Sequence, residues 1–342
     1  MGDNPSLAHC LDRATTCVAD AGQRSDLIAI VCALAGASIN IAETIALGKL
    51  AATEPLARSL NADGDIQLAV DLVAQQLIVD ALRFHSVRRL VSEESEQAIA
   101  LDEEGAFDVA VDPLDGSSNL DTDTSVGTIF SISPAGHLAC DGSRQVAAGF
   151  AVYGPRTELI LTLGDGVDIF TLDRKDRQWR LTRAQVRIPE DASEYAIKIG
   201  NYRHWHAPFR AFFDDCLKGV DDGRRGDFNL RWIGSLVGEA YRILARGGLY
   251  LYPADTRRGF ERGRLRLLYE AHPIAFLMTQ AGGFASTGSE PILERSSDRL
   301  HERTPLIFGS AAMVERMERL CGHPEGRAEI SPLFGHRGLF RV

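Results

Sequence analysis

The sequence predicts a layered fold in which helices precede strands in the first half of the chain and alternate with them in the second. Residues up to 82 place apolar side chains at helical spacing, whereas residues 87–172 form a series of short strand-like runs. Beyond residue 188, strand and helix patterns alternate. The first arrangement is typical of α+β layering and the second of α/β folds, so we expect mixed sheets between helix layers.

The N-terminal part is predicted to be helical. An apolar stripe that runs from Leu27 to Ile45 covers two helices, with Gly36 as the break between them. A third helix is predicted over residues 65–82, where Asp65 occupies a favourable N-cap position.

A series of strands is expected to follow, separated by turns rich in glycine and proline. The strands are predicted at residues 87–91, 107–111, 126–133, 145–153, 158–163 and 167–172. The polar stretch 173–187 offers few core residues, and we expect the junction between two domains there, residues 1–187 and 188–342.

The second half is predicted to alternate between strands and helices. Strands are expected at residues 196–199 and 249–252, and helices at residues 208–217, 235–246, 273–280 and 311–320. This alternation is typical of an α/β arrangement.

The composition limits the classes of function. The chain has 342 residues and a formal net charge of −10, which disfavours a nucleic-acid-binding protein. An acidic protein that binds an anionic substrate needs metal ions or a local group of basic side chains. We identify no apolar stretch of membrane-spanning length and no basic leader with an apolar core, so we expect a cytoplasmic protein. The six cysteines are dispersed without a Cys-x-x-Cys pair, which predicts reduced, buried thiols.

The segment from Asp112 to Asn119 carries the strongest chemical signal. It follows the apolar run 107–111 and reads Asp-Pro-Leu-Asp-Gly-Ser-Ser-Asn. Pro113 is expected to stop the strand ladder and to turn the chain, which holds Asp112 and Asp115 near each other. Paired carboxylates attract a hard divalent cation, and the Gly-Ser-Ser turn offers N–H groups and hydroxyls to a phosphoryl oxygen. The segment therefore predicts a metal-assisted phosphate site.

Further carboxylates follow other predicted elements. Glu93 and Glu94 come after a strand, and because adjacent strand residues point to opposite faces, at most one is expected to face a given metal unless a turn intervenes. Glu270 lies between an apolar run and a proline-initiated helix. A solvated surface position explains each of these residues equally well. Asp65 and Asp71 are weaker candidates, and for Asp65 the N-cap interpretation is the stronger one.

A dense group of arginines occurs late in this acidic chain. It comprises Arg257, Arg258, Arg262, Arg264 and Arg266. Guanidinium groups match phosphate oxygens well, and Tyr250 and Tyr252 offer hydroxyl donors nearby. We expect Arg257 and Arg258 to be solvated. His204 and His206 are expected to contact a substrate rather than zinc, because no third ligand follows at metal-binding spacing.

Several blocks of residues in order along the chain form one recognisable pattern. They are Gly64-Asp65 with Asp71, residues 91–94, residues 112–117, residues 127–130, Arg231 with Gly234-Ser235, Gly247-Gly248 with Tyr252-Pro253, and residues 266–270 with Pro273 and residues 281–283. Residues 112–117 alone are shared with inositol monophosphatase-like proteins. Together the blocks, which cover most of residues 25–320, resemble class I fructose-1,6-bisphosphatases within the magnesium-dependent, lithium-sensitive phosphatase superfamily. The resemblance implies the layered αβαβα sugar-phosphatase fold, with mixed sheets between the helix layers.

The resemblance also implies a metal site. Its ligands would be the side chains of Glu93, Asp112, Asp115 and Glu270 and the carbonyl of Leu114. Two or more Mg²⁺ ions per subunit are implied, for which Mn²⁺ can substitute. Glu94 and Asp71 would lie beside the attacking water, and Asp65 would share the neighbourhood of the metals.

The same resemblance implies how a sugar bisphosphate is held. Asp115, Gly116, Ser117 and Ser118 would hold the region of the 1-phosphate. The distal 6-phosphate would be held by Asn201, Tyr252 and Arg264, with Arg231 supplied by a neighbouring subunit of a homotetramer. No nucleic acid or membrane partner is expected.

Some positions depart from the pattern of the family. The family usually has lysine at Arg264 and tyrosine at Trp232, so a hydroxyl contact to the distal phosphate is missing. Family members inhibited by AMP carry a Lys-Tyr pair where this chain has Ala106-Phe107, and an arginine where it has Pro134. We therefore predict weak or absent inhibition by AMP. The redox-regulatory cysteine loop of the chloroplast enzymes has no counterpart, which argues against control by thioredoxin.

The activity implied is magnesium-dependent hydrolysis of the 1-phosphate of fructose 1,6-bisphosphate to fructose 6-phosphate and phosphate. The main alternative is sedoheptulose-1,7-bisphosphatase activity, alone or in addition, because a longer sugar needs only a different grip on the distal phosphate. An inositol-phosphate phosphatase is disfavoured by the second anionic contact predicted at Arg264. A non-catalytic sugar-phosphate sensor would be expected to lack metal-binding carboxylates, and none is missing here.

Overall fold

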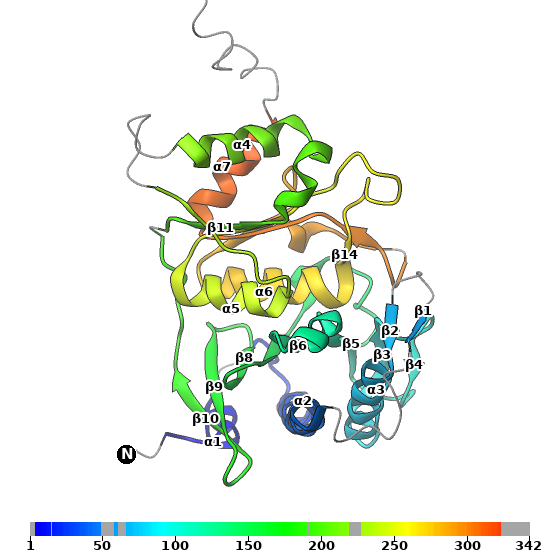
Figure 1. Ribbon diagram of the computed structural model, residues 1–342. Helices are drawn as coiled ribbons and strands as arrows, with labels where there is room; N and C mark the ends of the chain where they lie inside the picture. Colours follow the sequence, from blue (N-terminus) through cyan, green and yellow to red (C-terminus); the bar gives the residue numbers. More distant parts are fainter. Residues whose placement is uncertain are drawn as a thin grey trace, which may run out of the picture.

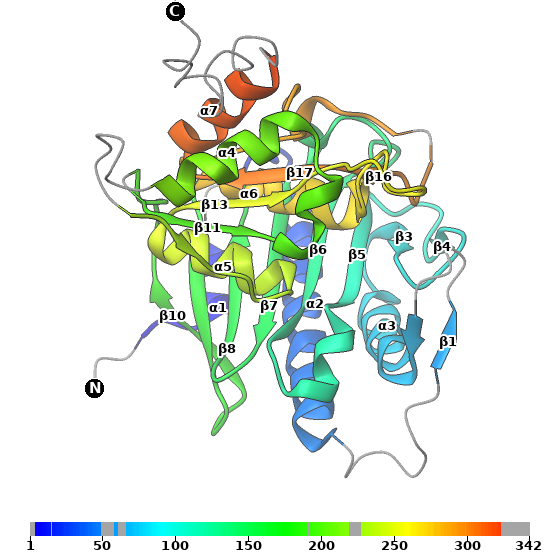
Figure 2. The same ribbon diagram turned by 45° about the horizontal axis from the view of Figure 1, so that its top comes forward.

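A computed structural model describes residues 4–14, 16–48, 58–60, 66–190, 192–218, 227–297 and 299–322. Within this part of the chain, helix layers and sheets alternate (Figure 1). Helices α1 (Leu7–Arg13), α2 (Ala21–Leu47) and α3 (Ala69–Leu82) cover the outer face of the first sheet. Helices α5 (Leu236–Arg246) and α6 (His272–Gln280) lie between the two sheets, and α4 (Ala207–Lys218) and α7 (Ala311–Gly322) cover the second sheet (Figure 2). The predicted αβαβα layering is confirmed.

The first sheet has the strand order β10-β9-β8-β7-β6-β5-β3-β4. Its strands are β3 (Val87–Ser92), β4 (Ile99–Ala100), β5 (Phe107–Asp115), β6 (Val126–Pro134), β7 (Ala147–Tyr153), β8 (Thr157–Thr162), β9 (Asp168–Asp173) and β10 (Gln178–Arg183). Strands β3 and β5 are parallel, and the other neighbouring pairs are antiparallel. Both faces are covered, so most positions of β5 to β8 are buried.

The second sheet has the strand order β12-β11-β13-β17-β15 and is also mixed. It consists of β11 (Glu194–Ile197), β12 (Asn229–Leu230), β13 (Leu249–Tyr252), β15 (Phe284–Ser286) and β17 (Leu306–Gly309). Two short pairs lie outside the large sheets, β1 (Arg58–Leu60) with β2 (Ile66–Leu68) and β14 (Leu265–Arg266) with β16 (Arg303–Thr304). One apolar core joins the inner faces of both sheets to α5 and α6, so the two halves of the chain pack as one body.

Several sequence predictions need correction at the N-terminal end. The apolar stripe from Leu27 to Ile45 forms one continuous helix, α2, rather than two helices broken at Gly36. Packing of the stripe outweighs the cost of about 1 kcal/mol that a glycine imposes on a helix. The third helix begins at Ala69 rather than at residue 65, because Ile66–Leu68 pairs with β1. Asp65 itself lies outside the described residues.

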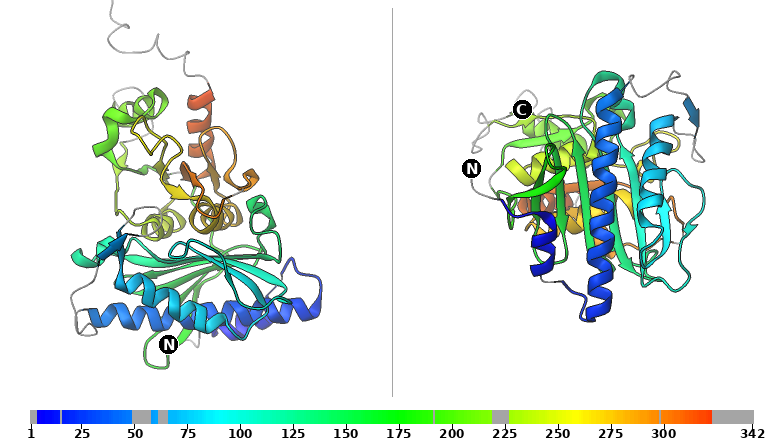
Figure 3. Two further views of the ribbon diagram at one scale, coloured as in Figure 1. Left: turned by 90° about the vertical axis from the view of Figure 1, so that its right-hand side faces the viewer. Right: turned by 90° about the horizontal axis from the view of Figure 1, so that it is seen from below.

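Helix α2 also corrects the statement that no apolar stretch reaches membrane-spanning length. It has 27 residues and a window of mean hydropathy 1.8, which suffice by length and composition alone. The helix lies flat beneath the first sheet (Figure 3). Leu27, Ile30, Val31 and Leu34 are fully buried in the core between the helix and the sheet. Its apolar character is therefore explained by burial inside the protein.

The polar stretch 173–187, where the junction between two domains is predicted, contributes to the first sheet. It contains β10, the edge strand of the first sheet, and Trp179 on this strand is buried with its indole N–H donating to the Ala35 carbonyl (3.0 Å). The six cysteines are free, as predicted, but Cys216 is the only buried one; Cys17 and Cys32 are exposed.

Candidate functional site

The segment from Asp112 to Asp115 forms the end of β5. Pro113 does not stop the ladder as predicted: Asp112 pairs with Ile129 and Asp115 with Gly127, so a bulge accommodates the residues between them. Within the bulge, the Leu114 N–H donates to Asp112 Oδ1 (3.0 Å). Gly116 then takes φ +73°, a left-handed conformation that favours glycine, and starts the turn into Ser117. The bulge brings the two carboxylates to one end of the sheet.

A third carboxylate joins them from the second half of the chain. One oxygen each of Asp112, Asp115 and Glu270 lie within 4.8 Å of one another, and all three residues are buried. Glu270 lies on a π-helical turn, Leu267–Ala271, that connects β14 to α6. Its carboxylate accepts a hydrogen bond from the Arg266 N–H. Such π turns occur often at functional sites, because they place a side chain that a regular helix would turn away.

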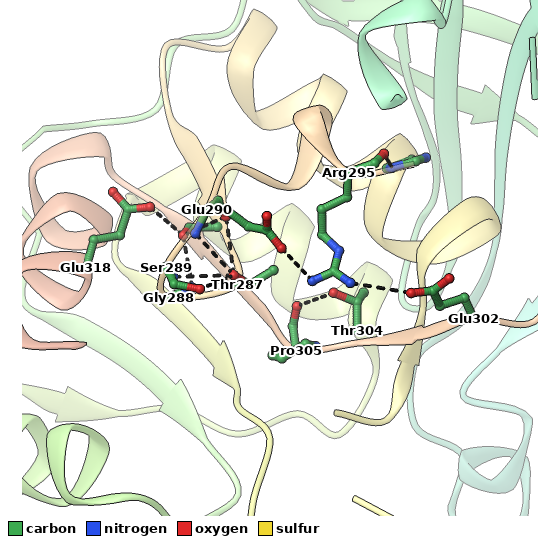
Figure 4. A network of polar contacts seen from close by, with 11 residues as sticks. Thr287, Gly288, Ser289, Glu290, Arg295, Glu302, Thr304, Pro305 and Glu318 are labelled. Carbon is green, nitrogen blue, oxygen red and sulfur yellow. Dashed lines mark hydrogen bonds and ion pairs between the residues drawn. The ribbon is translucent and has the colours of Figure 1, made fainter. Parts of the chain in front are cut away.

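The turn that carries Glu270 is braced by a polar network on neighbouring loops (Figure 4). Arg295 forms ion pairs with Glu290 (2.8 Å) and Glu302 (3.4 Å). The Glu302 carbonyl accepts from the Leu267 N–H (2.8 Å), and the imidazole of the buried His272 lies 3.1 Å from the Arg295 carbonyl. Both ends of the π turn are thus fixed to the same network.

Glu93 and Glu94 lie in a turn directly after β3, beside β5. The Glu93 N–H donates to the Val111 carbonyl (3.2 Å), and the Glu94 N–H to Ser92 Oγ (3.3 Å). Because a turn intervenes, strand alternation does not separate the two side chains, and both act electrostatically on Asp112. Glu93 retains some accessible surface at this edge of the site.

The carboxylates strongly perturb one another. Desolvation is the largest cause of the raised pKa values of Glu93 and Asp112. The next cause for Glu93 is repulsion from Glu270, and for Asp112 it is repulsion from Glu93. Desolvation also raises the pKa of Asp115 from 3.8 to about 6, opposed by hydrogen bonds from Val237 and Ser235. The charge of the Arg266 guanidinium opposes this repulsion and lowers the pKa of Glu93. Close-packed carboxylates of this kind are the oxygen donors that hard divalent cations prefer.

Comparison with known proteins identifies the family. Residues 11–184 match the description "Fructose-1-6-bisphosphatase, N-terminal domain", and residues 188–322 match "Fructose-1-6-bisphosphatase, C-terminal domain". The chain belongs to the fructose-1,6-bisphosphatase family. The resemblance inferred from the sequence blocks is thereby confirmed, and the family is metal-dependent.

Relatives and solved structures agree with this membership. A class 1 fructose-1,6-bisphosphatase of Rhodopseudomonas palustris (strain BisB18) is 52% identical over 324 residues, which covers 93% of this chain and 94% of the relative. One from Nitrobacter hamburgensis is 53% identical and covers 91% and 92%, respectively. The holo form of Leishmania major fructose-1,6-bisphosphatase has a TM-score of 0.85 at 33% identity and covers 93% of this chain and 99% of that one.

Further residues predicted at the family's catalytic centre lie around the Gly116 turn. Asp71, in the first turn of α3, is buried and accepts a hydrogen bond from Ser117 Oγ at its Oδ2 (3.3 Å). Leu114 is buried in the bulge, whereas Ser118 is exposed in the turn. Asp71 and the predicted phosphate turn are therefore in direct contact.

The residues predicted for the distal phosphate come from two loops and a strand of the second sheet. Tyr252 is the last residue of β13. Desolvation raises the pKa of its hydroxyl, and the positive charges of Arg264 and Arg257 partly oppose this rise. Asn201 is buried in the turn Ile199–His204, and the His204 carbonyl accepts from the Thr256 N–H (3.1 Å) in the arginine-rich loop. Asn201, Tyr252 and Arg264 thus lie on segments of the chain that adjoin one another.

Other predictions for this region change. Arg257 is not simply solvated: it forms a close ion pair with buried Asp255 and lies 4.1 Å above the Phe260 ring. Within this chain Arg231 forms an ion pair with Glu194 (3.4 Å), and its side chain is 52% exposed. An ion pair exposed to this extent costs little to break.

For two residues the sequence did not predict a place beside the carboxylate cluster. Arg266 was grouped with the phosphate-binding arginines, but it is buried beside Glu93 and its Nη1 donates to the Arg264 carbonyl (3.0 Å). Ser235 was part of a family block without a role, and it contacts Asp115 directly. Alternation along β14, where Leu265 is half-buried and Arg266 is buried, was the local signal for Arg266, and the N-cap position before α5 was the local signal for Ser235.

Proposed function

We propose that this chain hydrolyses the 1-phosphate of fructose 1,6-bisphosphate with the side chains gathered at the end of β5. The observation that carries the proposal is the convergence of Asp112, Asp115 and Glu270 within 4.8 Å beside a glycine turn. Hydrolysis of this phosphate monoester by the chain follows from its family membership and from relatives at about half identity over nearly the full length.

We propose Mg²⁺ as the metal, with two or more ions per subunit and Mn²⁺ as a substitute. The donor set fits, because it consists of carboxylates whose pKa values are raised by desolvation and mutual repulsion, which a divalent cation relieves. The ligands would be Glu93, Asp112, Asp115 and Glu270 with the Leu114 carbonyl. Bound there, the metal would neutralise phosphoryl oxygens and lower the pKa of water.

The protein groups that handle the proton are proposed to be Glu94 and Asp71. The oxygen of water attacks phosphorus in line, the bond to the oxygen of C1 breaks, and the carboxylates accept the proton that water loses. Asp71 supports this role through its contact with Ser117 in the phosphate turn. The alkoxide that leaves takes up a proton, giving fructose 6-phosphate and phosphate. Asp65 is proposed to share this neighbourhood.

The rest of the substrate would be held at two places. Asp115, Gly116, Ser117 and Ser118 are proposed to hold the region of the 1-phosphate. The 6-phosphate is assigned to a group comprising Asn201, Tyr252 and Arg264, with Arg231 reaching in from a neighbouring subunit of a homotetramer. The weak, exposed pairing of Arg231 with Glu194 would be exchanged readily for a phosphate.

We also propose that residues 1–187 and 188–342 form two domains, the first carrying most metal ligands and the second the distal phosphate site. The boundary falls between β10 and β11, where the chain passes from the first sheet to the second. A cytoplasmic location is proposed as well, and fractionation of cells that express the chain would test it.

The test is phosphate release from fructose 1,6-bisphosphate, sedoheptulose 1,7-bisphosphate and inositol 1-phosphate, each with Mg²⁺ and with a chelator. We expect turnover of the fructose substrate that disappears on chelation and is reduced by orders of magnitude in Asp115→Ala. Asp123→Asn, an exposed acid in the following turn, is the matched control and should retain activity. Near-wild-type turnover by Asp115→Ala at moderate Mg²⁺, or faster turnover of either other substrate, would contradict the proposal.

A further inference from the structure

The N-terminus of α5 meets the carboxylate of Asp115 across the boundary between the two halves of the chain. Ser235 Oγ donates to Asp115 Oδ2 (3.0 Å), and the Val237 N–H donates to the same oxygen (3.0 Å). Ser235 and Asp115 are only 3% and 8% exposed, respectively. Both hydrogen bonds are therefore shielded from water, and both involve an ionisable acceptor, which makes them stronger than neutral ones.

Ser235 holds this carboxylate with a proton whose direction is fixed. It is the N-cap of α5, and its Oγ accepts a hydrogen bond from the Gly238 N–H (3.3 Å). A backbone N–H only donates and a carboxylate only accepts, so the hydroxyl proton must point at Asp115. The helix cap and the contact with Asp115 thus share one hydroxyl group.

The end of α5 is fixed on both sides of this contact. Asn119 Nδ2 donates to the Gly234 carbonyl (3.2 Å), which ties the residue before Ser235 to the turn after Asp115. On the other side, Gly127, the register partner of Asp115, packs so closely on Val237 that an added Cβ would lie 2.6 Å from Val237 Cγ2. Two independent contacts therefore fix the start of α5, one against the turn after β5 and one against β6.

We propose that Ser235 is a positioning residue that, together with the Val237 N–H, fixes the orientation of the Asp115 carboxylate toward Asp112 and Glu270. Without these donors, repulsion among three buried carboxylates would favour rotation of Asp115 away from the cluster. With them, one oxygen is held and the carboxylate stays directed at its neighbours. This role rests on the proposed function, and it adds to the site Ser235, a residue that is not one of the proposed metal ligands.

The segment that ends at Ser235 also reaches the proposed distal phosphate group, because the ring centroid of Trp232 lies 6.1 Å from that of Tyr252. Trp232, three residues before Ser235, stacks on Tyr250 with ring centroids 6.0 Å apart and planes at 8°. It is 37% exposed, whereas Trp179 and Trp205 are buried. Fluorescence changes on adding ligand should therefore arise mainly from Trp232, so its emission reports on the segment that ends at Ser235.

The test compares Ser235→Gly with Ser235→Thr. Glycine is a tolerated N-cap, but Ser235→Gly also removes a hydrogen bond to a buried carboxylate, so Tm should fall by about 2–4 °C. We expect a loss of about 10- to 100-fold in Mn²⁺ affinity or in kcat, as is typical for residues that orient metal ligands. The Mn²⁺ affinity is measured by calorimetry in the absence of substrate. Ser235→Thr keeps the hydroxyl and should restore both quantities to within about threefold of wild type.

Ser6→Gly is the matched control, because Ser6 caps α1 away from the site. It should leave kcat, Mn²⁺ affinity and the Trp232 response to Mn²⁺ unchanged. Wild-type kcat and Mn²⁺ affinity in Ser235→Gly would overturn the inference, as would equal losses in Ser235→Gly and Ser235→Thr. If the wild-type protein binds Mn²⁺ but releases no phosphate from fructose 1,6-bisphosphate, the proposed function fails, and the calorimetric comparison still decides the role of Ser235.

Discussion

The buried carboxylates should make the metal-free protein less stable than a variant that lacks one of them. The perturbation is Asp115→Asn, which is nearly isosteric and retains an oxygen that can accept from Ser235 and Val237. In the wild-type protein the pKa of Asp115 is raised from 3.8 to about 6, chiefly by desolvation. A folded-state pKa above the unfolded value means that ionisation costs stability, so the neutral asparagine removes that cost at neutral pH.

The magnitude follows from this shift. A rise from 3.8 to about 6 corresponds to about 3 kcal/mol, at 1.36 kcal/mol for each pKa unit. For 342 residues the entropy of unfolding is about 0.7 kcal/mol per kelvin, so the expected gain in Tm is about 4 °C. The cost is absent below about pH 4, where Asp115 is protonated in both states, and is complete once the pH has risen above about 6.

The assay is thermal unfolding of both proteins in a chelator across this pH range. We expect the variant to be more stable at pH 8 and the difference to vanish on acidification. Burial lowers the pKa of His272 to about 4, so acid destabilises both proteins equally and this effect cancels in the difference. Mg²⁺ at about 1,000 times the Kd of the wild type should reverse the order, because binding then stabilises the wild type by about 4.1 kcal/mol, which exceeds the cost of ionising Asp115. A variant that is no more stable than wild type at pH 8 in chelator would refute this reasoning.

Three further predictions concern other parts of the site. Gly127→Ala should cost about 1–3 kcal/mol, measured as a lower Tm, because its Cβ would meet the Ala151 carbonyl at 2.1 Å; an unchanged Tm would contradict the close packing. Trp232→Tyr restores the missing hydroxyl and should lower KM for fructose 1,6-bisphosphate about fivefold, for a hydrogen bond of about 1 kcal/mol, with little change in kcat. AMP should leave the rate unchanged, because Phe107 and Pro134 pair on β5 and β6 and neither is a cation; potent inhibition in a rate assay would overturn this.

Local patterns predicted most strands, because each is a short apolar run between turn residues. They failed where a tertiary contact decided the outcome. Pro113 lacks an N–H and was expected to end the ladder, but a bulge places it where β5 needs no donor. In the same way, β10 has a polar sequence and one buried anchor, Trp179, so its pairing with β9 depends on a neighbour rather than on its own composition.

The candidate site was predictable only in part for a related reason. Asp112 and Asp115 are three residues apart, so their proximity follows from the local chain. Glu270 is distant in sequence, and only the family resemblance assigned it to the same site. Ser235 contacts Asp115 across 120 residues and has no local signal beyond its N-cap position. Arg266 was grouped with the arginines that match phosphate oxygens, because the sequence does not show that its guanidinium is buried beside Glu93.

The position of the site between the two halves explains how such a costly cluster is tolerated. Each carboxylate that is ionised and desolvated weakens the folded state by several kcal/mol, a large part of the stability of an ordinary domain. The core that joins both sheets to α5 and α6 is extensive, and the groups that oppose the repulsion, Arg266 and the N-terminus of α5, are held on elements anchored in that core. Because these groups come from the second half and the bulge from the first, the site can form only when both halves have packed. Metal affinity and the packing of the two halves should therefore rise and fall together.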